Sequence, residues 1–212
     1  MKSDVFLINS DAGRIAAARY ATENFAWHAK LDKRSALRLD LLVEETLGMM
    51  RVMVDDFYGR LWFVGDDKAC EIHLEATANI DSDKKQELLS MSSSGRNASA
   101  KGFMAMLGDV ISGALHNIGG AMNEAYGPNA VALGYVPQAG MGTPSVYDMT
   151  PLWTLEQYKT SLEQGKLSDD ALENAKNDLE KSIVANLADD IVVGVKGDRI
   201  ELVITKRFDT DK

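Results

Sequence analysis

The first 80 residues of the chain alternate between strand and helix patterns. A short apolar run at residues 5–8 predicts a β-strand, and Ser10 or Asp11 is placed to cap a helix after it. Apolar or small residues then recur every three or four positions, as on one side of an amphipathic helix: Ile15, Ala18, Thr22, Phe25, Ala26 and Ala29. A second helix is predicted from residues 31–32 to about residue 54. Its leucines, valines and methionines cover most of its circumference, which predicts a central helix.

Two β-hairpins are predicted, one after these helices and one near the end of the sequence. The arms of the first are residues 61–64 and 70–76, and Gly65-Asp66-Asp67 is its turn. Its second arm alternates, with Cys70, Ile72, Leu74 and Ala76 on one face and Glu71, His73 and Glu75 on the other. The second hairpin has arms at residues 191–195 and 200–205. A helix over residues 168–188 precedes it, with Ser168 as its cap and Asp169 and Asp170 near its positive end.

Residues 97–153 differ in composition from the rest of the chain. They hold all four prolines and nine of the 17 glycines, but only Lys101, Asp109, Glu124 and Asp148 carry charge. Residues 100–118 could form a helix, and the remainder is predicted as loop. Long loops in compact domains are often functional, and the methionines and tyrosines of this one could contact a protein partner. It could equally pack against its own sheet.

Composition narrows the class of protein. The formal net charge of −9 argues against non-specific binding to nucleic acid or anionic membranes. Cys70 is the single cysteine, and no two of the three histidines share a helical spacing, so no metal site is predicted. Asp109, His116 and several glycines argue against a membrane span at residues 102–121. Without a signal-peptide pattern at residues 1–11, a cytoplasmic location is expected.

The order of elements predicts an α/β (α+β) two-layer sandwich, with a mostly antiparallel mixed sheet and helices on one face. Residues 1–212 would form a single domain, with residues 97–153 as a Gly/Pro-rich insertion. In the central helix, Leu41-Leu42-Val43-Glu44-Glu45-Thr46-Leu47-Gly48-Met49-Met50 follows the frame apolar-apolar-Val-x-Glu-x-x-x-Asn-Ala. With this frame the chain resembles the GHKL superfamily, the ATP-binding fold of histidine kinases and anti-sigma regulatory proteins. The resemblance implies a Bergerat-type fold whose ATP lid is the insertion.

The resemblance also implies site residues. Glu45 takes the place of the glutamate that activates water, and its apolar neighbours would raise the pKa of its carboxyl group. The asparagine that holds Mg²⁺ is replaced by Met49, whose thioether is a poor ligand for this ion. If the motif is aligned one residue earlier, Glu44 takes the glutamate position and Gly48 takes the asparagine position, so the asparagine is still absent. Asp81 could take the place of the aspartate that recognises adenine, although the glycines of the Asp-x-Gly-x-Gly motif are absent.

A polar run after the first hairpin is a second candidate part of the site. Hydroxyl groups, a glycine and a guanidinium precede a possible helix start, and such groups can hold phosphate (Ser92, Ser93, Ser94, Gly95, Arg96, Asn97, Lys101 and Gly102). The same composition is also typical of a plain linker. Glu45 likewise has a structural alternative, in which it pairs with an arginine or extends to water.

Two functions follow from these observations. The first is a nucleotide-binding regulatory protein that binds ATP, with the insertion contacting a protein partner. The second is a catalytically inactive pseudo-ATPase that acts as a protein–protein interaction module. His28, His73 and His116 lack the setting of a kinase phosphoacceptor, and His73 is predicted to be a surface or hydrogen-bonded histidine. The oligomeric state is not predicted.

Overall fold

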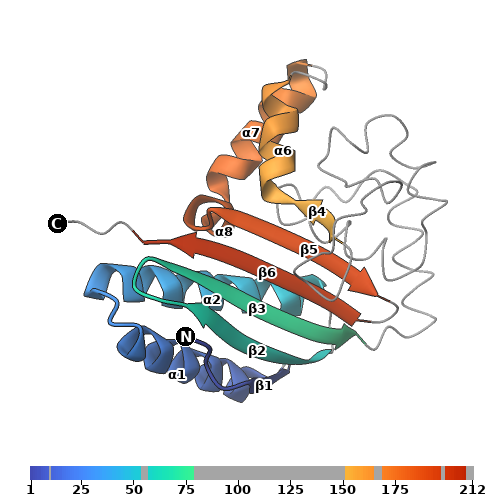
Figure 1. The fold of residues 1–212 in the computed structure, drawn as a ribbon. Helices are drawn as coiled ribbons and strands as arrows, with labels where there is room; N and C mark the ends of the chain where they lie inside the picture. The colour runs from blue at the N-terminus through green and yellow to red at the C-terminus, as the bar shows by residue number, and fades with distance from the viewer. Residues whose placement is uncertain (10, 54–56, 79–150, 165–168, 197–198, 209–212) are drawn as a thin grey trace.

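The computed structural model describes residues 1–9, 11–53, 57–78, 151–164, 169–196 and 199–208. Its centre is a six-stranded sheet in the order β1-β2-β3-β6-β5-β4 (Figure 1). The strands are β1 (Phe6–Asn9), β2 (Phe57–Gly65), β3 (Ala69–Ala78), β4 (Pro151–Thr154), β5 (Asp190–Lys196) and β6 (Arg199–Arg207). All five neighbouring pairs are antiparallel. The predicted α+β class is therefore confirmed, whereas the sheet of the described residues is antiparallel throughout rather than mixed. The N-terminal and C-terminal halves of the sheet meet at the β3–β6 pair.

Helices lie on one side of this sheet. Helices α1 (Ala12–His28) and α2 (Lys33–Met53) pack against each other behind β1, β2 and β3 in Figure 1. Helix α8 (Ile183–Leu187) contacts α2, whereas α6 (Leu155–Glu163) and α7 (Asp169–Lys181) rise together beyond the β4 side of the sheet. We call the sheet face toward α1 and α2 the inner face, and the opposite face the outer face.

The inner face contains the core that the alternating pattern predicts. Strands β2, β3, β5 and β6 each direct alternate apolar residues inward, and these join α1, α2, α6 and α8 in one buried cluster. Its sheet residues include Leu61, Phe63, Cys70, Ile72, Leu74, Ala76, Ile191, Val193, Leu202 and Ile204. Gly59 belongs to the same face, and a Cβ atom there would lie 2.4 Å from the Glu75 carbonyl oxygen. The backbones of β2 and β3 can therefore approach closely only with glycine at this position.

Short polar side chains set the ends of the helices. Asp32 caps α2, because its Oδ1 atom accepts hydrogen bonds from the backbone N–H groups of Arg34 (2.7 Å) and Ser35 (3.1 Å). Thr154 caps α6 by accepting from the Gln157 N–H group at 3.1 Å. Ser182 caps α8 and separates it from α7. The helix predicted over residues 168–188 is therefore two helices within the described residues 169–188.

The C-terminal half contains two elements that the sequence patterns did not predict. These are β4 and α6, which follow each other at Thr154. Residues 151–153 had been grouped with the low-charge segment, yet they form most of β4. Trp153 is fully buried in the core and pairs with Val193 of β5. This half of the sheet is thus closed by a short edge strand with a large aromatic anchor.

Helix α2 is less buried than its composition suggests. Leu39, Leu42, Val43, Leu47 and Met50 point into the core. In contrast, Leu37 is 60% exposed and Leu41 is 40% exposed. The helix predicted to be central therefore contributes to the core but keeps an exposed apolar side.

Candidate functional site

Among the predicted site residues, Glu45 is the one that lies in the described part of the chain. It is half-buried on α2, and no hydrogen bond or ion pair of its carboxylate is found among the described residues. Glu44 is exposed and acts electrostatically on Arg19, so it faces α1. Consecutive residues of an α-helix point about 100° apart, so Glu45 points to a different side of α2. The two glutamates of the predicted motif are therefore separated on the surface of α2.

The surface of α2 is exposed one helical turn beyond Glu45. Gly48 is exposed, and no described atom lies within 4 Å of the position that a Cβ atom would occupy there, apart from the helix's own backbone and the adjacent residues. Residues three apart on a helix are neighbours on its surface. Glu45 therefore has an exposed glycine beside it on α2.

The remaining predicted residues lie outside the described ranges. They are Asp81, Ser92, Ser93, Ser94, Gly95, Arg96, Asn97, Lys101 and Gly102. Their roles in recognising a base or a phosphate stay predictions, as does the role of residues 97–150 as a lid.

The described residues do not fit a magnesium site. No group of three or more His, Cys, Asp or Glu side chains that could hold a metal ion is found in the described ranges. At position 49, where the resemblance to the GHKL superfamily would place a metal-binding asparagine, the chain has methionine. A thioether is a poor ligand for Mg²⁺, which prefers oxygen atoms. We therefore derive no step that uses this ion.

A second feature of α2 is a shallow hollow at its N-terminal half. It has a volume of about 390 Å³ and is lined by Lys33, Arg34, Leu37, Arg38 and Leu41. Residues 27–38 contain four cationic side chains and one carboxylate in a chain whose net charge is −9. Sequence reasoning missed this surface because the apolar residues cover most of the circumference of the helix and do not indicate which side stays exposed.

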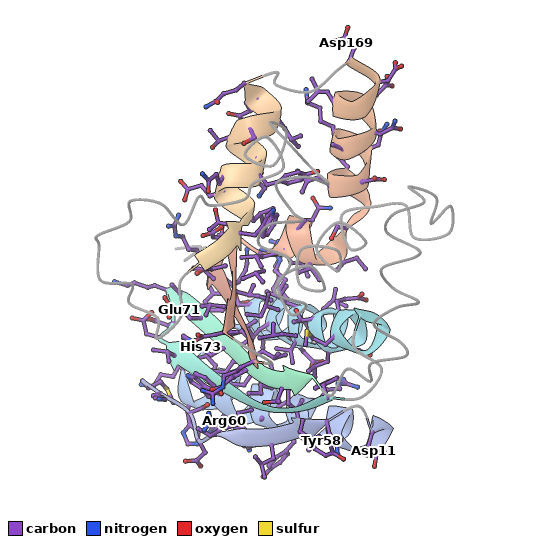
Figure 2. All side chains as sticks on the ribbon, turned by 90° about the vertical axis from the view of Figure 1, so that its right-hand side faces the viewer. Asp11, Tyr58, Arg60, Glu71, His73 and Asp169 are labelled. Carbon is purple, nitrogen blue, oxygen red and sulfur yellow. The ribbon has the colours of Figure 1, made fainter. Side chains whose placement is uncertain are left out.

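The outer face of the sheet carries a network of charges across three strands. Arg60 of β2 donates to both carboxylate oxygens of Glu75 on β3, at 2.8 and 2.7 Å. Arg199 of β6 contacts the same carboxylate at 3.2 Å. Figure 2 shows Arg60 on the side of the sheet away from α2. Both guanidinium groups are half-exposed, so the network is screened by solvent and contributes little to stability.

A buried histidine lies next to this network. His73 Nε2 is 3.0 Å from Glu71 Oε2, and the imidazole stacks on Trp62 with ring centroids 5.0 Å apart. Burial lowers the pKa of His73, while the hydrogen bond that its ring N–H donates to the Glu71 carboxylate opposes that shift. His73 was predicted to be a surface or hydrogen-bonded residue, and the structure shows the second. A neutral imidazole beside a carboxylate could accept a proton from a nucleophile. The thiol of Cys70 cannot be that nucleophile, because Cys70 points to the opposite face of β3.

The thiol of Cys70 is not a reactive group in this structure. It is fully buried in the core, and burial raises its pKa well above the ordinary value. Thiolate is the nucleophilic form of cysteine, so a raised pKa disfavours nucleophilic chemistry at Cys70.

In the described ranges, no helix is both long and apolar enough to cross a membrane.

Comparisons with known proteins add no assignment to this geometry. Neither protein-family models, nor curated proteins, nor solved structures give a match to the chain.

Proposed function

We propose that this chain is a GHKL-type regulatory protein that binds ATP or a related nucleotide against helix α2. The observation that carries the proposal is the position of Glu45 beside the open surface at Gly48. The order of elements supports it, since a strand, two helices and a hairpin are followed by helices and a second hairpin, as the resemblance implies. In this proposal residues 97–150 form the lid, and Asp81 and residues 92–102 contact the base and the phosphates.

Binding without turnover is the form of this function that the residues favour. Met49 replaces the metal-binding asparagine, so the phosphate charges must be neutralised without the usual Mg²⁺ site. The protein would then transmit its nucleotide state to a protein partner. The second candidate is a pseudo-ATPase that binds partners without any nucleotide, and Met49 is also the observation that favours it.

Calorimetric titration distinguishes these two functions. We expect ATP and ADP to bind with similar affinity in the presence of Mg²⁺ and in the presence of a chelator. Binding should also raise the melting temperature, because a ligand that binds only the native state stabilises it. No heat and no shift of melting temperature at millimolar nucleotide would refute the nucleotide proposal and favour the pseudo-ATPase.

Substitution of Gly48 tests where the nucleotide lies. Gly48→Leu should stabilise the fold by up to about 1 kcal/mol, because leucine is the better helix former and no described atom obstructs it. The same variant should bind nucleotide at least about tenfold more weakly, a loss of about 1.4 kcal/mol. Gly48→Ala is the matched control, since it gives a similar gain in stability but adds only a methyl group. Unchanged affinity in Gly48→Leu would place the ligand elsewhere.

Glu45 and Glu44 provide a second matched pair for this site. Glu45→Gln keeps the size of the side chain and should leave affinity nearly unchanged while removing any residual hydrolysis. Glu44→Gln is the control, because Glu44 faces Arg19 of α1. Hydrolysis that persists in Glu45→Gln would show that Glu45 is not the general base.

A further inference from the structure

We propose that the side of helices α1 and α2 that faces away from the sheet is the interface of a homodimer. Four large apolar side chains are exposed there: Tyr20 and Trp27 on α1, and Leu37 and Leu41 on α2. We call these four side chains the helix-layer patch. The partner that fits this patch is a second copy of the chain, related by a twofold axis. The inference goes beyond nucleotide binding and does not depend on it.

The helix-layer patch extends over both helices, which lie side by side (Figure 1). Tyr20 is 64% exposed and Trp27 is 81% exposed, and the two are seven residues apart, so they point to the same side of α1. Leu37 and Leu41 are four residues apart and are neighbours on the surface of α2. Both pairs point away from the buried residues of their own helices, which face the sheet. An exposed apolar surface of this kind indicates an interaction site.

An ion pair shows how the two helices are aligned. Arg19 of α1 contacts Asp40 of α2 at 3.0 Å, and the helices are antiparallel because a short turn joins them. Tyr20 therefore lies beside the turn of α2 that carries the two leucines. Trp27 lies about two turns farther toward the end of α1. These positions define which residues meet when a second copy packs against the layer.

One antiparallel register places the apolar side chains of two copies against each other. With a twofold axis level with the turn between the leucines, Leu37 faces Leu41 of the second copy, and Leu41 faces its Leu37. On α1 the same axis passes Tyr20, so the two Tyr20 rings meet. Trp27 faces the first turn of α1 of the second copy, where Gly13 has no side chain to obstruct the indole ring. Helices α1 and α2 of both copies would then form a four-helix bundle.

Charge selects a second copy as the partner, because the charges around the leucines are complementary to themselves. Helix α2 carries the cations Lys33 and Arg34 before the leucines and the carboxylates Glu44 and Glu45 after them. The antiparallel register therefore brings Lys33 to Glu44 of the second copy and Arg34 to its Glu45. The twofold axis makes each of these pairs twice. A strongly acidic or strongly basic partner would leave half of these charges unmatched.

Net charge does not oppose this contact locally. Residues 19–45 contain five Lys or Arg and five Asp or Glu side chains, so they are neutral in a chain whose net charge is −9. The excess of acidic residues therefore belongs to other parts of the chain. Charges farther apart than about 8 Å are largely screened at physiological salt.

The area of the helix-layer patch is in the range that a stable dimer needs. Aromatic side chains bury about 150–250 Å² each, so the four apolar side chains supply more than half of the roughly 800 Å² that a standard interface buries per partner. The charged residues around them supply a polar rim. Tyrosine, tryptophan and arginine are also the residue types that are enriched in protein interfaces.

Sedimentation equilibrium of the full chain over a range of concentrations, without nucleotide, tests the proposal. We expect the wild type to be a monomer–dimer equilibrium. Leu37→Ser with Leu41→Ser should weaken the dimer at least about tenfold, because each substitution removes apolar burial from both copies. Leu7→Ser is the matched control, since Leu7 is equally exposed but lies on β1, and it should leave the dimer unchanged. Circular dichroism and melting temperature check that each variant folds.

A pair of charge reversals tests the register. In Lys33→Glu two glutamates meet across the interface, and in Glu44→Lys two lysines meet, so each variant alone should self-associate at least about tenfold more weakly than the wild type. In an equal mixture of the two variants both pairs become opposite again, and a heterodimer of wild-type affinity should form. Lys176→Glu on α7 is the control for a change of net charge, and it should dimerise like the wild type.

Several outcomes would overturn the proposal. A wild type that stays monomeric at every concentration would exclude a homodimer, and a dimer that is unchanged in the leucine double variant would place the contact elsewhere. A mixture of the charge variants that stays monomeric would exclude the antiparallel register. Because Glu45 lies at the edge of this interface, the absence of nucleotide keeps the two proposals separate. Failure to dimerise would leave calorimetric nucleotide binding untouched, and failure to bind nucleotide would leave the dimer in place.

Discussion

The two faces of the sheet use the same strands for different purposes. On the inner face, Leu61, Phe63 and Leu74 are buried under α1 and α2 and belong to the single core cluster. On the outer face, the neighbouring residues Arg60 and Glu75 form ion pairs that solvent reaches. Successive side chains of a strand point to opposite sides, so one residue of register separates core from surface. Burial energy therefore fixes the inner face, and the outer face is freer to vary.

This comparison makes its largest prediction at Phe63. The ring is fully buried and stacks on Phe25 with centroids 5.1 Å apart. Phe63→Ala should lower the free energy of unfolding by roughly 3–5 kcal/mol, because a cavity remains beneath α1. Tyr58→Ala on the outer face of the same strand should change it by less than about 0.5 kcal/mol. Urea denaturation measures both values, and similar losses would show that the two faces do not differ in this way.

The sequence predicts those parts of the fold whose pattern is local and repeated. The second arm of the first hairpin shows a period of two from Cys70 to Ala76, and its alternation matches the observed burial except at His73, which is buried on the opposite face. Asp32 caps the central helix close to its predicted start. In contrast, β4 has four residues and pairs with β5 about 40 positions later, so no local period indicates it. The break at Ser182 is hidden because helix-forming residues stand on both sides.

The candidate site was predictable only where one helix carries it. Glu45 could be placed on α2 from spacing alone, since residues on one helix keep a fixed geometry. The exposure of Leu37 and Leu41 could not be predicted from spacing. A helix that is apolar on most sides does not indicate which side its neighbours leave uncovered. The network of Arg60, Glu75 and Arg199 depends on the pairing of three strands, and spacing within one strand does not reveal it.

The buried His73 predicts a moderate effect that depends on pH. Burial lowers the pKa of His73 from its ordinary value in the folded protein, so the unfolded chain binds this proton more readily. Stability should therefore fall as the pH decreases through about 6.5, and this loss should level off below the folded pKa. His73→Gln should show a flatter dependence of melting temperature on pH between about 5 and 7. His28→Gln, at an exposed position, is the control, and equal slopes in all three proteins would contradict the assignment.

The smallest effect is expected at Glu75, where the outer face has its densest charge network. Glu75→Gln removes two ion pairs, but Arg60 and Arg199 are each 51% exposed and can return to water. The free energy of unfolding should decrease by about 1 kcal/mol or less, and the difference should shrink at high salt. Asp40→Asn, which breaks the exposed Arg19–Asp40 pair between α1 and α2, should behave similarly. A loss above about 2 kcal/mol in Glu75→Gln alone would mean that the ion pairs of the outer face also hold the three strands together. The two faces would then differ in composition but not in their contribution to stability.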